Sequence, residues 1–367
     1  MAAEIVDASK LAEEREALKK YGVVLKQGHL EGYKIRPDRA FEQKELKPWE
    51  TSTDVMADVP AMPRKYTLEN WANPDVKFEV KGQIAYATLN RPDANNAMNT
   101  GISQGIQDAV YHLQAHPEIR IFVLQAEGKM FCAGGDPKSF QEAQAGAGVI
   151  EAGSAAEIAA GPPPGESIAL ASDRTSYNLA AANSFAKLLY QLSTLPQYTI
   201  GCAQGSAMGG GVGLLCVCDT VLATQRSYFA LSEVKLGVIP ATISPYVIRK
   251  IGAANAKKVF CTGESIKPTK AVEYGLVQQL VQTKEDFPKQ IQKMATQLQQ
   301  CSPAAVAESK RLIAMLMYQP ISESLLRFTA QDYARVRKSP EADAAISGLS
   351  AKKRPAWMES PIQVEGA

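Results

Sequence analysis

A run of glycines inside an apolar stretch is the feature that most limits how this chain can fold. Residues 208–219 read Met-Gly-Gly-Gly-Val-Gly-Leu-Leu-Cys-Val-Cys-Asp, and they follow an apolar segment, 198–204, that is expected to form a strand. A chain without side chains at such a point either turns too tightly for a Cβ or brings its backbone against another group. The first N–H groups of a helix starting here would lack partners within the helix, and the helix dipole would add positive charge. The run therefore predicts either close helix packing or a backbone site for an anionic oxygen.

Two phosphate-binding motifs fail to fit the glycine run. A Walker A loop needs Lys followed by Ser or Thr after its glycines, and neither pair follows here. A dinucleotide-binding turn needs the spacing Gly-x-Gly-x-x-Gly and an acidic residue that ends the next strand. The spacing fits only when forced, and Glu233 lies beyond Phe229-Ala-Leu-Ser rather than at a strand end. The sequence thus points away from nucleotide phosphates.

Two other stretches offer partners for the run. Met130-Phe-Cys-Ala-Gly-Gly-Asp136 follows a second apolar segment, 119–124, which is expected to be a buried strand. Two glycine turns that each follow a strand can direct two N–H groups at one point, which is the arrangement of an oxyanion hole. Ser232-Glu-Val-Lys-Leu-Gly-Val-Ile-Pro240 places Glu233 in an apolar setting, where its pKa would rise and suit it to acid–base work. Considered alone, Glu233 is more readily explained as an ordinary surface residue of a helix or loop.

Cys132 and Asp136 adjoin the same turn. No histidine lies near Cys132 in the sequence, so a thiolate nucleophile is not expected. Asp136 is expected to cap the helix that follows it.

Composition excludes several classes of protein. The net charge of the 367 residues is +2, too small to indicate a nucleic-acid partner. The six cysteines form no Cys-x-x-Cys pair and only three histidines occur, so no metal site is expected. No run of 18 apolar residues predicts a membrane span, and residues 1–20 lack the apolar core of a secretory signal. We expect a protein of the cytoplasm or of an organelle matrix (mitochondrion or plastid), not a secreted one.

The chain divides by composition into successive regions. An N-terminal extension, 1–75, is helix-prone at 8–21 and rich in proline beyond it. An α/β core is expected over 76–265, with an Ala/Gly/Pro-rich insertion at 141–175, and a helical region over 266–357 precedes a tail, 358–367. Expected elements are a hairpin at 78–89, a strand at 220–224, and helices at 101–114, 177–193, 210–217, 245–259, 268–274, 286–299, 303–317 and 320–347.

Four motifs in this order resemble those of the enoyl-CoA hydratase/isomerase (crotonase) superfamily. They are Asn90-Arg-Pro-Asp-Ala-Asn-Asn-Ala-Met98, Phe131-Cys-Ala-Gly-Gly-Asp136, Gly205-Ser-Ala-Met-Gly-Gly-Gly-Val-Gly213 and Ser232-Glu-Val-Lys-Leu-Gly-Val-Ile-Pro240. The resemblance covers residues 76–357, and within the superfamily it is nearest to the methylglutaconyl-CoA hydratase-like subgroup. It implies an α/β fold, the ClpP/crotonase-like spiral of ββα units, with a helical C-terminal trimerisation region. It also implies a homotrimer or a dimer of trimers.

The resemblance also implies a substrate and a site. The substrate would be an acyl-CoA thioester, with no cofactor beyond the coenzyme A of the substrate. The N–H groups of Gly135 and Gly210 would form the oxyanion hole, and Glu233 would be the catalytic acid or base. The positions that match CoA contacts of the family are Asp93, Ala94, Asn95, Ala97 and Ala133, and, in the C-terminal region and often acting on a neighbouring subunit, Leu349 and Lys352.

Gly213 departs from the family pattern. Typical members carry two glutamates, one at this position and one at that of Glu233, and this chain keeps only the second. In hydration, two carboxyl groups share the two proton transfers. Isomerisation needs one base, and decarboxylation needs only the oxyanion hole. The sequence ranks the three in that order, because subgroup resemblance favours hydration. A catalytically inactive CoA-binding subunit is the alternative from another class.

Overall fold

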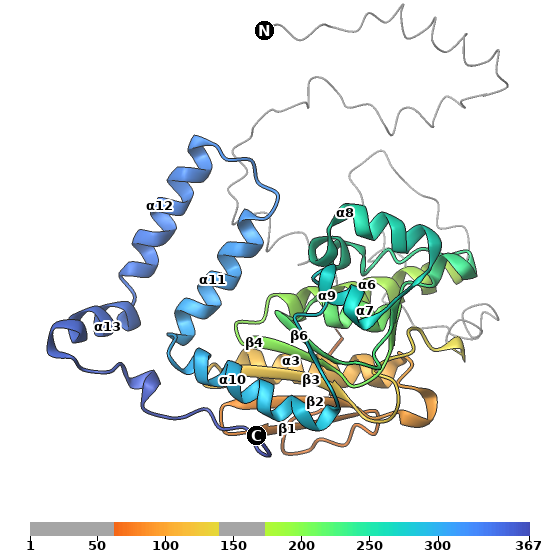
Figure 1. Cartoon of the computed structure of the whole chain (residues 1–367), viewed down its shortest axis with the longest axis horizontal. Coiled ribbons are helices and arrows are strands. Elements are labelled where there is room, and N and C mark those ends of the chain that lie inside the picture. The colour runs from red at the N-terminus through yellow and green to blue at the C-terminus, as the bar shows by residue number, and fades with distance from the viewer. Residues whose placement is uncertain (1–61, 139–172) are drawn as a thin grey trace, which may run out of the picture. The chain divides into compact units, whose positions relative to one another are not determined.

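The computed structural model describes residues 62–138 and 173–367 (Figure 1). They lie within one compact unit, Ser52–Ala367. The helix expected at 8–21 and most of the 141–175 insertion fall outside the described residues. The described strands form a six-stranded sheet in the order β1 (Val76–Lys81), β2 (Ile84–Leu89), β3 (Ile121–Ala126), β4 (Tyr198–Ala203), β6 (Thr220–Thr224) and β9 (Gln279–Val281). A smaller sheet has the order β5 (Ala207–Met208), β7 (Phe229–Ala230) and β8 (Ser265–Ile266).

The large sheet begins with a hairpin and continues with parallel strands. β1 and β2 are antiparallel, and Lys81 pairs with Ile84 across the two-residue turn at Gly82 and Gln83. Gly82 has φ +59, the left-handed conformation that such turns require. This confirms the expected hairpin. The pairs β2–β3, β3–β4, β4–β6 and β6–β9 are all parallel.

Helices cover both faces of the sheet, which explains why the central strands β2 and β3 are largely apolar. In β2, Ala85, Ala87 and Leu89 belong to a core that includes apolar residues of α3 (Thr100–Ala115). Ile84 and Tyr86, which point to the opposite face, belong to a second core with α10 (Phe287–Gln299). The other described helices are α6 (Asp173–Ser193), α7 (Gly210–Cys216), α8 (Ser244–Thr262), α9 (Pro268–Glu273), α11 (Pro303–Leu316), α12 (Glu323–Arg337) and α13 (Pro340–Ala351).

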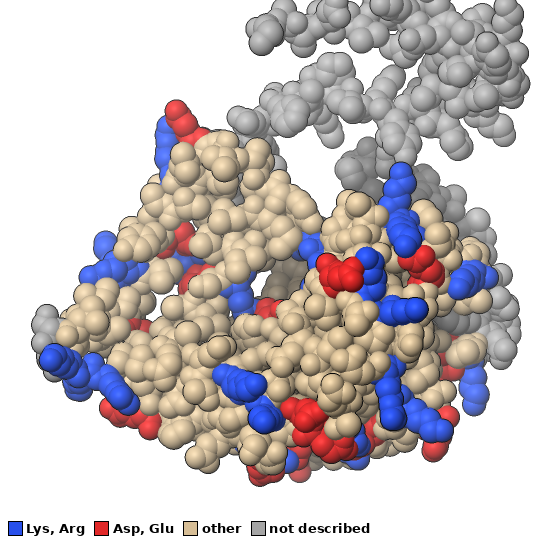
Figure 2. All heavy atoms as spheres, viewed as in Figure 1, with Lys and Arg blue, Asp and Glu red and all other residues tan. Residues whose placement is uncertain are grey.

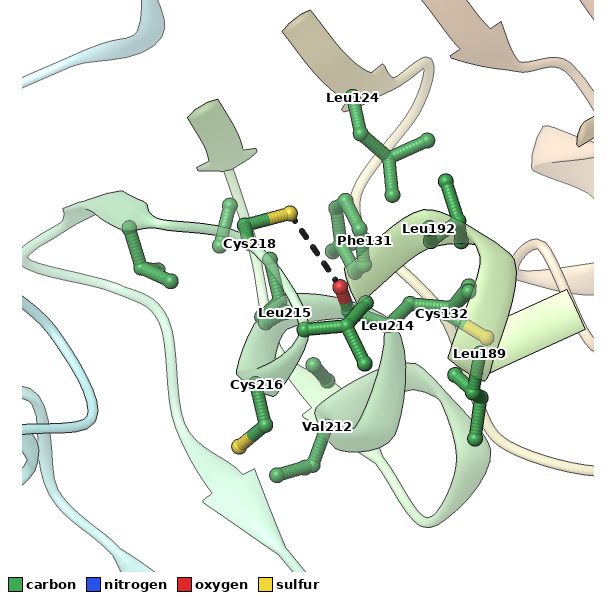
Figure 3. Packing of buried hydrophobic residues seen from close by; sticks show 14 of the residues in the cluster. Leu124, Phe131, Cys132, Leu189, Leu192, Val212, Leu214, Leu215, Cys216 and Cys218 are labelled. Atoms are coloured by element: carbon green, nitrogen blue, oxygen red, sulfur yellow. Dashed lines mark hydrogen bonds between the residues drawn. The ribbon is translucent and has the colours of Figure 1, made fainter. Parts of the chain in front are cut away.

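The short helix α7, which carries the glycine run, is embedded in the first core (Figure 3). Leu214 and Leu215 are fully buried among side chains of β3, α6 and the segment after β3. Cys218 Sγ donates to the carbonyl oxygen of Leu214 at 3.3 Å. Cys216 and Cys218 are buried, as expected for small apolar residues. Packing on all sides therefore fixes the direction of this helix.

The C-terminal helices differ from expectation at one point. The sequence predicts one helix over 320–347, but the structure has two, α12 and α13. The chain breaks where Pro340 lacks an N–H and Ser339 caps α13 by accepting from Ala342 N. Ion pairs of Arg335 with Glu308 and of Arg311 with Asp332 join α12 to α11, and the two helices lie side by side in Figure 1.

Charge is dispersed over the described surface. Figure 2 shows basic and acidic side chains interspersed on the visible face, without one large patch of either sign. Within residues 62–138 and 173–367, no helix combines the length and hydropathy needed to cross a membrane.

Candidate active site

The two glycine turns leave from neighbouring, paired segments. Cys132 and Ala207 form a parallel bridge, and Met208 N donates to Cys132 O at 2.8 Å. Three residues beyond this bridge, each of the two segments reaches a glycine that the sequence predicts as an oxyanion donor, Gly135 after Cys132 and Gly210 after Ala207. The pairing thus places the two turns next to each other.

Glycine is required at the bend of each turn. Gly134 has φ +90 and Gly209 has φ +48, in the region that residues with a Cβ rarely adopt. The approach is also close: a Cβ on Gly134 would lie 3.1 Å from Met208 O, and one on Gly209 would lie 3.8 Å from Gly134 Cα. Conformation and proximity therefore both explain the absence of side chains.

The N–H groups of Gly135 and Gly210 have no hydrogen-bond acceptor among the described residues. The neighbours of Gly135 are fixed, because Met98 N donates to Gly134 O at 2.7 Å and Asp136 N donates to Met98 O at 3.0 Å. Gly210 is the first residue of α7, where the helix dipole adds positive charge. Two free donors on adjacent fixed turns can stabilise a developing oxyanion.

Glu233 lies beside these turns. It opens a short 3-10 helix, η3 (Glu233–Leu236), and a Cβ on Gly209 would be only 3.0 Å from Glu233 Oε1. Glu233 Oε2 is buried without a hydrogen-bond partner among the described residues. Burial raises the pKa of this carboxyl group, opposed only by a bond from its own backbone. A carboxyl group with a raised pKa is suited to act as a general acid or base.

Two apolar side chains that the sequence interpretation did not assign stand next to Gly210. A Cβ at this position would lie 3.4 Å from Phe185 Cζ, on α6, and 3.8 Å from Met98 Cγ. Met98 ends the first motif of the sequence, whereas Phe185 carried no signal beyond its place in an apolar helix pattern. They give the oxyanion donor an apolar wall.

Gly213 is buried against Ile243. A Cβ there would lie 2.2 Å from Ile243 Cγ2 and 2.9 Å from Ile243 Cβ, and Ile243 itself is 2% exposed. Gly213 lies three residues beyond Gly210 on the same helix, so the two positions lie on the same face of that helix. The position at which the family pattern would place a second glutamate is therefore filled by an isoleucine side chain that lies 30 residues further along the chain.

The residues that match CoA contacts divide into two groups. Asp93, Ala94, Asn95 and Ala97 lie on the loop around η2 (Pro92–Ala94), and Ala133 N donates to Asn95 O at 3.0 Å. The structure thus brings these positions together with the first glycine turn. Leu349 and Lys352 are exposed at the end of α13, and no hydrogen bond or ion pair of the described residues joins them to this loop.

Arg91 and Asp136 form a further contact between these motifs. Arg91 Nη2 donates to Asp136 Oδ2 at 3.1 Å, and its Nη1 donates to Ala97 O at 2.5 Å. Asp136 Oδ1 accepts from Lys138 N, as expected for a capping side chain. Burial alone would raise the pKa of Asp136, but the bonds from Lys138 and Arg91 together hold it below its usual value.

Other chemistries receive no support from the described residues. The Cys132 side chain is fully buried, and burial raises the pKa of its thiol to about 11, which leaves it protonated at neutral pH. Within the described part of the chain, no three His, Cys, Asp or Glu side chains are grouped so that they could hold a metal ion.

Comparison with known proteins agrees with this geometry. The family model for enoyl-CoA hydratase/isomerase matches residues 84–363. A putative enoyl-CoA hydratase/isomerase of Bacillus subtilis, YngF, is 30% identical over 238 residues, which are 64% of this chain and 80% of that protein. A probable mitochondrial enoyl-CoA hydratase of Dictyostelium discoideum is 25% identical over 296 residues, or 80% and 94% of the two chains.

Solved structures show the same fold. A putative enoyl-CoA hydratase/isomerase (crotonase) of Legionella pneumophila has a TM-score of 0.61 and 31% identity, and the match covers 78% of this chain and all of that one. An enoyl-CoA hydratase of Shewanella pealeana has a TM-score of 0.66 and 30% identity, with 77% and 96% of the chains covered. The chain therefore has the crotonase fold and belongs to the enoyl-CoA hydratase/isomerase family.

Proposed function

We propose that this chain acts on an acyl-CoA thioester through an enolate and that it moves a double bond from the β,γ to the α,β position. The observation that carries the proposal is that Glu233 Oε1 lies beside Gly209, the residue before Gly210, while the N–H groups of Gly135 and Gly210 have no acceptor among the described residues. Asp136 is nearby, but its carboxylate is bound by Arg91 and Lys138. One base and two oxyanion donors are the groups that a proton shift requires.

The reaction would proceed in two proton transfers. The thioester oxygen accepts hydrogen bonds from Gly135 and Gly210 while Glu233, ionised, removes a proton from Cα. The electron pair of that C–H bond passes into a dienolate whose negative charge rests on the thioester oxygen. Glu233 then gives the proton to Cγ, the double bond settles between Cα and Cβ, and the carboxylate is restored. No cofactor is needed beyond the coenzyme A of the substrate.

Hydration is the second candidate, and the names of the relatives favour it. Here Glu233 would take a proton from water as the hydroxide adds to Cβ, and would then deliver that proton to Cα. A water held for this step needs two or more polar partners. Ile243 occupies the position next to Gly213 where the family pattern would supply one of them. For this reason we place isomerisation before hydration, including hydration of methylglutaconyl-CoA, which reverses the order favoured by the sequence.

A panel of thioesters tests the proposal. The chain and its Glu233→Gln variant are incubated in D₂O with 3-enoyl-CoA, crotonyl-CoA and methylglutaconyl-CoA, and the products are separated by chromatography before mass spectrometry. We expect the wild type to convert 3-enoyl-CoA to 2-enoyl-CoA with little deuterium, because Glu233 passes the same proton from Cα to Cγ. We expect little product from the other two esters. Added water would favour hydration, and loss of CO₂ would favour decarboxylation. Binding without turnover would favour a CoA-binding subunit.

We also propose that the chain assembles as a homotrimer or a dimer of trimers. Large apolar side chains are exposed along and between α11, α12 and α13: Ile313, Tyr318, Ile321, Leu326, Tyr333, Ile346 and Leu349. Exposed apolar residues in such density are typical of a surface that another chain covers. In the assembly, Leu349 and Lys352 would contact the CoA bound by a neighbouring subunit. Sedimentation velocity across a range of concentrations measures the assembly, and a monomer throughout would refute it.

A further inference from the structure

We propose that Arg91 is a positioning residue that holds the oxyanion turn in register with the loop of the first motif, and that Asp136 is its partner. The inference rests on the proposed function, because it assigns Arg91 a role in presenting the Gly135 N–H to the thioester oxygen. Nothing in the pattern of the motif separated Arg91 from its neighbours.

The guanidinium of Arg91 contacts three separate segments. Its Nη1 donates to Ala97 O, which belongs to the loop after β2, and its Nη2 donates to Asp136 Oδ2 in the glycine turn. Its Nε lies 3.6 Å from Asp75 Oδ1, in the segment that leads into β1. The side chains of Arg91 and Asp136 are 20% and 10% exposed, so solvent screens their ion pair little. One planar cation thus joins parts of the chain that are far apart in sequence.

The contact with Asp136 bears directly on the free donor. Asp136 is covalently next to Gly135, and on the other side Gly134 has φ +90, a conformation that glycine adopts without a steric penalty. Backbone bonds to Met98 fix the chain on both sides of Gly135. Arg91 adds a side-chain anchor at Asp136, and without it Gly134 and Asp136 would be bound to the loop only by their backbone bonds to Met98.

The contact with Ala97 extends the same anchor to the loop. Met98, which bonds to the glycine turn, follows Ala97 directly, and Arg91 N donates to the side chain of Asn96 at 2.8 Å. Asn96, fully buried, donates in turn to the carbonyl oxygens of Glu127 and Met130, which precede the glycine turn. The loop and the turn are therefore bound to each other at both ends, and at the Gly135 end Arg91 adds side-chain bonds to the backbone bonds of Met98.

Two variants and a matched control test this assignment. Arg91→Lys keeps the charge but cannot donate to Ala97 and Asp136 from one planar group, and Asp136→Asn keeps the size but removes the charge. Arg120→Lys is the control, because Arg120 is also largely buried and donates to two carbonyl oxygens, of Leu298 and Cys301, on the opposite side of the sheet. All three variants are purified as full chains and compared in their thermal melting.

Two measurements separate positioning from simple support of the fold. Steady-state kinetics on 3-enoyl-CoA give kcat and KM, and the ultraviolet absorbance of bound acetoacetyl-CoA reports how far the protein draws this thioester into its enolate form. We expect kcat to fall about tenfold to a hundredfold in Arg91→Lys and Asp136→Asn, with KM changed less than about threefold, as for a donor displaced by a fraction of an ångström. The enolate absorbance should weaken in both variants and remain at the wild-type level in Arg120→Lys.

The outcomes are distinct. Wild-type kcat and wild-type enolate absorbance in Arg91→Lys would overturn the assignment, as would an equal loss in Arg120→Lys. A failure of the proposed function looks different: the wild type would turn over none of the thioesters, or Glu233→Gln would match it. The enolate absorbance needs no turnover, so it decides the role of Arg91 even in that case.

Discussion

Gly213 and Ile243 should be coupled so strongly that one substitution changes sign with the other. In the wild-type background, Gly213→Ala places a Cβ 2.2 Å from Ile243 Cγ2. Non-bonded carbon atoms are most stable at about 3.5–4.0 Å, so the contact is short by more than about 1 Å. Ile243 is buried and cannot swing into solvent. The strain must therefore move side chains or backbone within the core.

The expected free energies follow from this geometry. Replacing glycine by alanine inside a helix stabilises it by about 1 kcal/mol, whereas overpacking a core costs about 1–3 kcal/mol. Gly213→Ala should therefore lower the free energy of unfolding by about 0–2 kcal/mol. Ile243→Gly alone should lower it by about 2–5 kcal/mol for the lost side chain and by about a further 1 kcal/mol for the added glycine. In the Ile243→Gly background both side-chain contacts are gone and the nearest atom of residue 243, its Cα, lies 3.9 Å from the new Cβ, so Gly213→Ala should raise the free energy of unfolding by about 1 kcal/mol.

A double-mutant cycle measures this reversal. Urea denaturation of the four proteins, at one protomer concentration because assembly adds to apparent stability, gives the free energy of unfolding of each. We expect a coupling of about 1–3 kcal/mol between the two positions. Additivity to within about 0.5 kcal/mol would refute the argument, since it would mean that Ile243 does not limit the space at Gly213.

Three further predictions concern the reacting groups. Glu233→Gln should lower kcat about 10²–10⁴-fold, measured by steady-state turnover. Burial raises the pKa of Glu233 in the folded protein above its unfolded value, so ionisation of this group favours unfolding. Urea denaturation over a pH series should therefore show the wild type, but not the variant, losing stability as pH rises from the unfolded to the folded pKa of Glu233. Gly210→Pro removes one oxyanion donor at a helix position that tolerates proline, and kcat should fall about 10²–10³-fold. Gly210→Ala keeps the N–H, and its Cβ would lie at an ordinary 3.4 Å from Phe185, so this variant should keep most of its turnover. An equal loss of kcat in both variants would point to packing rather than to the N–H group. Gly213→Glu alone should fold poorly, and Gly213→Glu combined with Ile243→Gly should gain product with added water from crotonyl-CoA. No such gain in a folded double variant would contradict the role assigned to Ile243.

The sequence predicted the elements that depend on local pattern. The hairpin at β1 and β2 follows from alternation around a glycine turn, and α3, β4, β6, α8, α9, α10 and α11 lie within a few residues of their expected bounds. The crotonase fold followed from four motifs in order, not from periodicity. The errors also have local causes: Ser339 and Pro340 divide the helix expected over 320–347, and β3 begins at Ile121 instead of 119.

The contacts that define the site could be predicted only in part. That two glycine turns and Glu233 meet was inferred from the resemblance, and the structure places Glu233 Oε1 beside Gly209. The bond of Arg91 to Asp136 joins residues 45 positions apart, and no periodic pattern marks such a pair. Ile243 was likewise invisible, because an isoleucine near a helix start is indistinguishable from any other core residue until its neighbour is known.

The neighbour of Gly213 bears on why the second carboxylate is missing. If a glutamate had been lost there without other change, the glycine would leave a space between α7 and the start of α8, and water could enter beside Glu233. Instead Ile243 fills that space to van der Waals contact and is nearly inaccessible to solvent. Meanwhile Glu233 keeps a buried oxygen that has no hydrogen-bond partner within residues 62–138 and 173–367, a costly feature that a packed core would not retain for stability. A site that stays closed to water at one position and keeps an unpartnered carboxyl group at the other suits a reaction in which one base moves a proton and water takes no part.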